Sequence, residues 1–118
     1  MKRKERVIKS EQFQRIRKEG RSYADHLLVL CALPNSLDHS RFGFAVGKRV
    51  GKAVVRNRIK RLVREAVRLQ QPHIAPGWDL VFIARARSHD VSFSQIQETV
   101  GRLLRRARLI NGRHGERE

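Results

Sequence analysis

The sequence predicts an α+β fold with one small sheet covered by helices, in the order helix, strand, one or two further strands, helix, strand, helix. The 118 residues fit a single domain, and 40% hydrophobic residues are enough for one core. Strand-like apolar segments occur at 27–33, 41–48 and 78–84, and segments with helical periodicity alternate with them. No repeat or linker divides the chain, so we expect one domain over 1–118, with charged tails at 1–8 and 110–118.

The first helix is predicted between Ser10, a favourable N-cap, and Gly20, a favourable C-cap. Phe13 and Ile16 lie three residues apart and share one side of it. The following segment, "SYADHLLVLCAL", ends in an apolar run typical of a strand. Pro34 and the turn-rich "PNSLDHS" stop that strand.

The segment "RFGFAVGK" alternates large and small residues with the period of a strand. Its large residues, Phe42, Phe44 and Val46, are predicted to face the core. Its small residues are Gly43, Ala45 and Gly47. The small face indicates either tight packing or the close approach of a helix, a backbone or a ligand.

A helix that is half apolar and half cationic is predicted from "VVRNRIKRLVREAVR", residues 54–68. At about 100° per residue, one stripe is formed by Val55, Ile59, Leu62, Ala66 and Leu69, with Val63 at its edge. The remaining surface is covered by cations. Residues 41–84 therefore form a βαβ-like unit, and its crossover would be right-handed by the general rule if the strands are parallel.

The last strand and the last helix are predicted from the same kinds of pattern. "WDLVFIA", residues 78–84, is typical of a buried strand, and "RARSHD" of a loop. In the last helix, Ser92 and Gln95 predict a capping box. The apolar rhythm of that helix is carried by Phe93, Ile96, Val100, Leu103, Leu104 and Ala107.

The charge balance is the strongest indication of function: 27 Lys and Arg face 11 Asp and Glu, for a net charge of +16. Nucleic acid is the commonest partner of such an excess, although a merely soluble basic protein is the alternative. The basic helix lacks the apolar face of a membrane-surface anchor. The longest apolar run, residues 27–33, is too short to span a membrane, and no signal peptide is recognised. With Cys31 as the single cysteine, we expect a cytoplasmic protein.

Cations are concentrated between residues 48 and 68, against Glu65 alone. They are Lys48, Arg49, Lys52, Arg56, Arg58, Lys60, Arg61, Arg64 and Arg68. Arg56, Lys60 and Arg64 repeat every four residues, and like charges at this spacing repel one another on a helix. Phosphate groups would relieve that repulsion, and arginine suits them well. Asn57 indicates either an RNA contact or a cap at the helix start.

Catalysis by the protein itself is not predicted. The acids are scattered, and Asp25 and Asp79 are best explained as strand-end carboxylates paired with arginines. The five histidines, at 26, 39, 73, 89 and 114, lack metal-ligand spacing, so we predict no metal site and no catalytic residue in the chain.

Four segments resemble the protein subunit of bacterial ribonuclease P: "SEQFQRIRKEG", "GFAVGKRVGKAVVRNR", "RNRIKRLVREAVR" and "DLVFIARA", within residues 4–108. The resemblance implies an α-β-β-β-α-β-α order, about four strands and a left-handed βαβ crossover. It implies a protein that binds the catalytic RNA and the single-stranded 5′ leader of precursor tRNA. The RNA would remove the leader with magnesium, and the protein alone would be a monomer.

The resemblance also implies sites. Arg56, Asn57, Arg58, Lys60, Arg61, Arg64 and Arg68 form the RNA-binding helix, preceded by Lys48, Arg49 and Lys52 in a loop. The leader-binding cleft would contain Phe13, Arg17, Val29, Cys31, Ala45, Lys60 and Arg64. Arg17, Cys31 and Ala45 depart from the residues that some relatives carry there, namely an aromatic, Tyr and Ser. These departures imply that the cleft stacks on leader bases more weakly and contacts leader phosphates more strongly.

The sequence leaves two other functions open. A ribosomal or nucleoid protein would have a similar charge, but Phe13 beside the basic helix favours a single-strand platform. A protein-only nuclease would have to use His and Asp.

Overall fold

The structure is a computed structural model that describes residues 10–110. Its helices and strands are α2 (Ser10–Glu19), β1 (Arg21–Ala24), β2 (Leu28–Pro34), β3 (Arg41–Val46), α3 (Ala53–Gln70), β4 (Trp78–Ala84) and α4 (Phe93–Arg106). Short 3₁₀ turns lie at Lys48–Val50, Gln71–His73 and Ala86–Asp90. The α-β-β-β-α-β-α order is confirmed. The predicted loop "RARSHD" is mostly the third of these turns.

The four strands form one mixed sheet in the order β1-β2-β4-β3. β2 is antiparallel to both β1 and β4, while β3 and β4 are parallel. The β3-α3-β4 segment is therefore a true βαβ unit, which makes α3 a crossover helix. The left-handed sense of this crossover stays a prediction of the resemblance.

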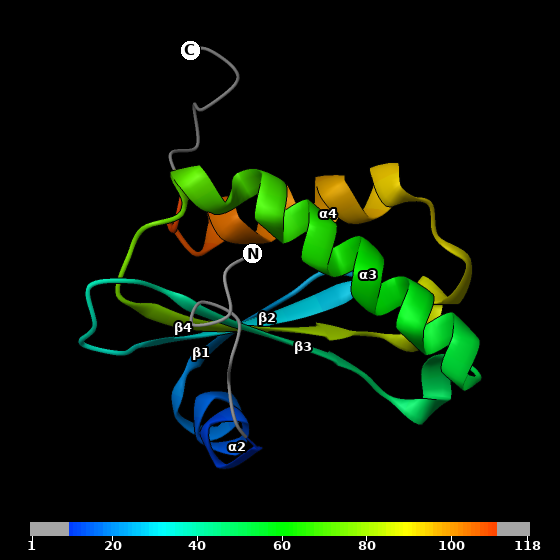
Figure 1. Cartoon of the computed structure of the whole chain (residues 1–118), viewed down its shortest axis with the longest axis horizontal. Helices are drawn as coiled ribbons and strands as arrows, with labels where there is room; N and C mark the ends of the chain where they lie inside the picture. The colour runs from blue at the N-terminus through cyan, green and yellow to red at the C-terminus, as the bar shows by residue number, and fades with distance from the viewer. Residues whose placement is uncertain (1–9, 111–118) are drawn as a thin grey trace.

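The sheet separates two helical layers: α3 and α4 cover one face, and α2 lies on the other (Figure 1). The core on the α3 and α4 side is the larger of the two and contains Phe42, Phe82 and Leu30. Phe44 and Phe82 stack there with ring centroids 6.1 Å apart. On the α2 side a smaller cluster is built around Ile16, Cys31 and Val81.

The alternation predicted for β3 is confirmed. Phe42, Phe44 and Val46 pack into the larger core. Ala45 lies beside Ile83 of β4, which lies beside Val29 of β2, so these three side chains share the α2 face of the sheet. Because α2 packs on β2 and β4, the small residues of β3 lie at the margin of this layer.

One part of the stripe predicted for α3 is wrong. Leu69 is 43% exposed, whereas Val63 and Val67 are buried together with Ile59 and Ala66. Periodicity gives the spacing of a stripe, but the direction of the buried face depends on the sheet beneath the helix. That face is rotated toward Val63 and Val67, which leaves Leu69 outside the core.

The end of the chain confirms the capping box and extends the core. Ser92 accepts from the backbone N–H of Gln95, and the Gln95 side chain accepts from the backbone N–H of Ser92. Leu109 and Ile110 are buried, so Ile110 belongs to the core rather than to the tail predicted from residue 110. The expected tail segments 1–8 and 111–118 lie outside the described residues.

Gly20 allows α2 to turn directly into β1. Its N–H donates to the Ile16 carbonyl, which closes the helix as predicted. A Cβ at this position would lie 2.6 Å from the carbonyl oxygens of Ile16 and Ala32, so only glycine fits without a backbone shift. Ser10 is the first residue of the helix itself, not a residue preceding it.

Candidate nucleic-acid interface

The cations of α3 occupy every side of the helix that the core leaves free. Arg61 and Arg68 are exposed, while Arg56, Arg58, Lys60 and Arg64 are partly buried along its two flanks. This arrangement follows from the sequence, because the buried positions of the helix are apolar and six of the remaining positions are cationic. The result is a positively charged ridge on the outer layer of the fold.

Three arginines of the ridge are anchored to the protein through part of the side chain. Arg56 Nε donates to the Gly51 carbonyl at 3.1 Å, and Arg58 Nη2 donates to the Val91 carbonyl at 2.5 Å. The Arg64 guanidinium lies over the Phe44 ring, 5.7 Å from its centroid. Each contact fixes a side chain that keeps guanidinium donors for a ligand, which in Arg64 are the two Nη groups.

The Arg64 Nε atom is buried and has no hydrogen-bond partner within residues 10–110. Arg68 instead forms a bidentate pair with Glu65, at 2.6 and 2.9 Å. This pair lowers the pKa of Glu65 and raises that of Arg68. This ion pair is exposed to solvent and therefore weak, so Arg68 can still attract an anion.

The start of α3 is also positive. Lys52 is the N-cap residue, its side chain does not cap the first backbone N–H groups, and the first turn contains no acid. Lys48 and Arg49 lie in the preceding 3₁₀ turn and are exposed. Asn57 is exposed in the second turn, so its alternative role as a cap at the helix start is excluded. Backbone N–H groups and three cations together favour an anion at this end.

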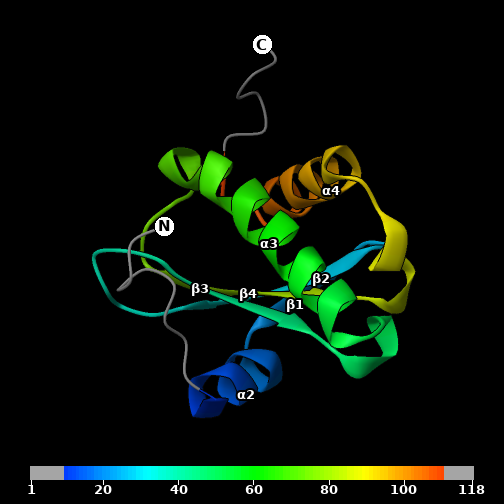
Figure 2. The same cartoon turned by 45° about the vertical axis from the view of Figure 1, so that its right-hand side comes forward.

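The residues predicted for the leader cleft fall into two groups on either side of the sheet. Phe13 and Val29 pack against the cluster that contains Cys31, which is itself only 3% exposed. Ala45 shares their face of the sheet, and Arg17 is exposed on α2. Lys60 and Arg64 belong to α3, in the other layer (Figure 2). β3 is an edge strand, so a ligand that contacts both groups would pass around that edge of the sheet.

The two acids considered for catalysis are held by arginines, as predicted. Asp79 binds Arg41 at 2.7 and 2.8 Å at the start of β4. Asp25 binds Arg102 at 2.8 Å near the other end of that strand. The hydrogen bond from Arg102 is the largest cause that lowers the pKa of Asp25 from 3.8 to about 2. Asp25 and Asp79 therefore do not form a carboxylate pair.

Within the described part of the chain, no three His, Cys, Asp or Glu side chains gather closely enough to hold a metal ion. Among residues 10–110 there is also no helix long and apolar enough to cross a membrane.

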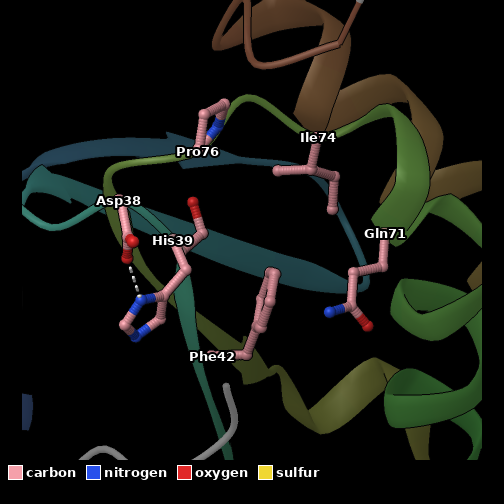
Figure 3. A pocket seen from close by; sticks show the side chains of 7 residues that line it. Asp38, His39, Phe42, Gln71, Ile74 and Pro76 are labelled. Atoms are coloured by element: carbon pink, nitrogen blue, oxygen red, sulfur yellow. Dashed lines mark hydrogen bonds and ion pairs between the residues drawn. The ribbon is translucent and has the colours of Figure 1, made fainter. Parts of the chain in front are cut away.

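Surface hollows were not recognised from the sequence. One, of about 170 Å³, lies where the β2–β3 loop meets the segment after α3, and Phe42 and Ile74 point into it (Figure 3). Asp38 binds His39 at its rim, with 2.8 Å between Oδ1 and Nδ1. The second lies between α3 and α4 and includes Phe93, which the sequence assigned to the core. Both combine residues distant in the sequence, so no local pattern reveals them.

The fold and the ridge define a class: a small α+β RNA-binding protein that presents a basic crossover helix on its outer layer. The comparisons with known proteins then identify the family. The profile of the Ribonuclease P family matches residues 1–108, and the chain belongs to this family. It is thereby a protein component of a tRNA-processing ribonucleoprotein whose RNA is its partner.

Individual relatives agree with this assignment. The chain is 54% identical over 113 residues to the ribonuclease P protein component of Roseiflexus castenholzii, covering 95% of this chain and 93% of the relative. Its fold is similar to the RNase P protein of Staphylococcus aureus, with a TM-score of 0.83, 38% identity, and 91% and 98% of the two chains covered. It is also similar to the RNase P protein of Thermotoga maritima, with a TM-score of 0.79 and 36% identity, covering 86% of this chain and 96% of that protein.

Proposed function

We propose that this chain binds the catalytic RNA of ribonuclease P through α3 and binds the 5′ leader of precursor tRNA on the α2 side of the sheet. The RNA then hydrolyses the precursor with magnesium and releases the mature 5′ end. The chain acts as a cytoplasmic monomer that supplies binding and no catalytic group. The observation that carries the proposal is a run of nine cations between Lys48 and Arg68, against Glu65 alone. Six of them form the ridge on α3, whose apolar face is buried, and three directly precede that helix.

Charge repulsion within the ridge supports RNA as the partner. Arg56, Lys60 and Arg64 are spaced four residues apart and carry like charges along one flank of α3. Each such pair costs a few tenths of a kcal/mol, roughly, in the free protein. Phosphate groups convert this repulsion into attraction and release counterions from the RNA.

The α2 layer supports the leader as the second ligand. Phe13 is half-buried in an apolar cluster, with the exposed Arg17 one turn further along the same helix. An aromatic residue beside cations binds single strands with little sequence preference. The proposed path runs from Phe13 past Ala45 and around the β3 edge to Lys60 and Arg64. Because Cys31 is buried, its contribution is to the packing beneath Phe13 and not to direct leader contact.

Assigning hydrolysis to the RNA is supported by the contacts of the two carboxylates that could have been catalytic. Asp79 is held by two hydrogen bonds from Arg41, and Asp25 is held by Arg102. Their oxygens are therefore engaged in the fold and not arranged to hold magnesium.

The test is cleavage of precursor tRNA by the cognate RNA at low magnesium, with and without the protein. We expect the protein to accelerate formation of the mature 5′ end and to lower the magnesium requirement. If the protein does not stimulate cleavage, the proposal is wrong. Accurate 5′ maturation by the protein and magnesium alone would instead establish a protein-only nuclease.

A second experiment separates leader binding from general RNA binding. Phe13→Ala should weaken binding of precursor tRNA by about 1–3 kcal/mol if a base stacks on the ring. Binding of mature tRNA, which lacks the leader, should not change. Phe13→Leu is the matched control for packing, because it keeps most of the apolar volume and loses the ring. An equal loss for both RNAs would show that the substitution acts on the fold.

A further inference from the structure

A groove between α3 and the start of α4 combines an apolar floor with a cationic rim. It has a volume of about 390 Å³ and most of its lining is apolar. The lining residues are Arg61, Leu62, Arg64, Glu65, Arg68 and Phe93. Its volume falls in the usual range of about 300–1,000 Å³ for small-ligand sites.

The apolar floor is held in place by the fold. Phe93 is the first residue of α4, and the capping box of Ser92 and Gln95 fixes the helix start on which it lies. The bond from Arg58 to the Val91 carbonyl ties the segment just before Phe93 to α3. Both Phe93 and Leu62 are only half-buried, so part of each stays open to the groove.

The rim carries three guanidinium groups and one carboxylate. Arg61 and Arg68 are exposed on the outer side of α3, where Glu65 pairs with Arg68 and leaves a net positive rim. Arg64 places its guanidinium on Phe44, on the β3 side of the helix. An apolar floor with a positive rim is complementary to a nucleotide, whose base is flat and apolar on its faces and whose phosphate is an anion.

We propose that this groove takes one unpaired nucleotide of the catalytic RNA, with the base against Phe93 and Leu62 and the phosphate on Arg61 and Arg68. The inference rests on the proposed function, since it assumes that α3 faces the catalytic RNA. The groove is lined by residues of α3 and α4, and these two helices lie on the opposite side of the sheet from α2 (Figure 2). Arg64 is shared with the proposed leader path, but Phe93 belongs to α4, which packs over β2 and β1 and not over the β3 edge around which that path runs. We therefore assign the groove to the catalytic RNA.

A neighbouring hollow of about 360 Å³ extends the proposed site along α4. It is lined by Gln70, Ser94, Gln97, Glu98, Gly101 and Arg105. Its residue Ser94 directly follows Phe93 in α4, and Gln70 lies two residues after Arg68 in α3. The amides of Gln70 and Gln97 carry the donors and acceptors that read base edges in unpaired RNA. The nucleotide next to the stacked one would contact these side chains.

The test measures the affinity of the full chain for its catalytic RNA. Phe93→Leu keeps an apolar side chain and removes the ring, so it should weaken binding by about 5- to 150-fold, the effect of losing one stacked base. Phe93→Tyr keeps the ring and should bind as the unchanged protein does. Leu37→Ala is the surface control, because Leu37 is an exposed apolar residue in the loop between β2 and β3. Thermal unfolding of each variant shows whether the fold is intact.

Two further readouts separate stacking from phosphate contact and identify the nucleotide. Phe93→Leu should leave the salt dependence of binding unchanged, while Arg61→Ala should lower its slope by about 0.7–0.9. Chemical probing of the bound RNA should show one unpaired nucleotide that is protected by the unchanged protein and reactive with Phe93→Leu.

Each outcome decides a different claim. Equal affinity of Phe93→Leu and the unchanged protein, both folded, would overturn the inference and leave the proposed function standing. A defect confined to leader-bearing tRNA would overturn it in favour of the leader. Failure of the unchanged protein to bind the catalytic RNA would overturn the proposed function itself.

Discussion

Replacing Arg58 by alanine tests whether a cation of α3 that faces RNA also holds the fold together. Arg58 Nη2 donates to the carbonyl of Val91, a buried residue, and so joins the middle of α3 to the start of α4. A hydrogen bond from a charged donor contributes about 1.5–3 kcal/mol. Since Arg58 is half-exposed and water replaces part of the bond, we expect a loss of about 1–2 kcal/mol in the free energy of unfolding.

This loss is measurable by urea and thermal unfolding. For a domain of this size each kcal/mol corresponds to roughly 3–6 °C in Tm. Arg61→Ala is the matched control, because Arg61 is exposed and should change stability by no more than about 0.5 kcal/mol. In RNA binding the two variants should agree: Arg58→Ala and Arg61→Ala should each lower the salt slope by about 0.7–0.9, because each removes one cation from the ridge. The reasoning is refuted if Arg58→Ala unfolds at the same urea concentration as the unchanged protein.

Two further predictions concern stability alone. The pKa of Asp25 lies at about 2 in the folded protein and near 3.8 when unfolded, so its pair with Arg102 stabilises the fold above pH 4 and loses that effect as the pH falls toward 2. Asp25→Asn should therefore cost about 1–2 kcal/mol at pH 5 and much less at pH 2.5, measured by urea unfolding; a cost independent of pH would contradict this cause. Gly20→Ala would place a methyl group 2.6 Å from two backbone carbonyl oxygens and should cost about 1–3 kcal/mol. Gly47→Ala, where a Cβ would meet nothing within 4 Å, should be nearly neutral in the same assay, and equal effects at both glycines would refute the argument.

Sequence patterns located the elements better than they oriented them. The alternation of Phe42, Phe44 and Val46 assigned both faces of β3, because side chains in a strand have only two possible directions. A helix offers a continuous range of directions. The periodicity of α3 therefore located the helix but misplaced Leu69, whose exposure depends on how the helix lies across the sheet.

The candidate site shows the same limit. The ridge was predictable, because its cations all belong to one helix and lie outside its apolar stripe. The separation of Phe13 from Lys60 and Arg64 was not, because it depends on which face of the sheet each helix covers. The groove at Phe93 was also missed, since an aromatic residue in a helical stripe is equally typical of a core.

Placing the RNA-binding cations on a core helix gives them fixed positions, which explains why one helix serves both purposes. An arginine free in solvent loses up to about 2 kcal/mol of side-chain entropy when it is immobilised by a ligand. Arg56 and Arg58 are already held by backbone carbonyls, and Arg64 by the Phe44 ring, so folding has ordered them before RNA arrives. Arginine suits this role because one part of the fork holds the protein and the rest remains free for phosphate. Lysine at these three positions would keep the charge and lose the anchor, so Arg→Lys should weaken RNA binding more there than at the exposed Arg61.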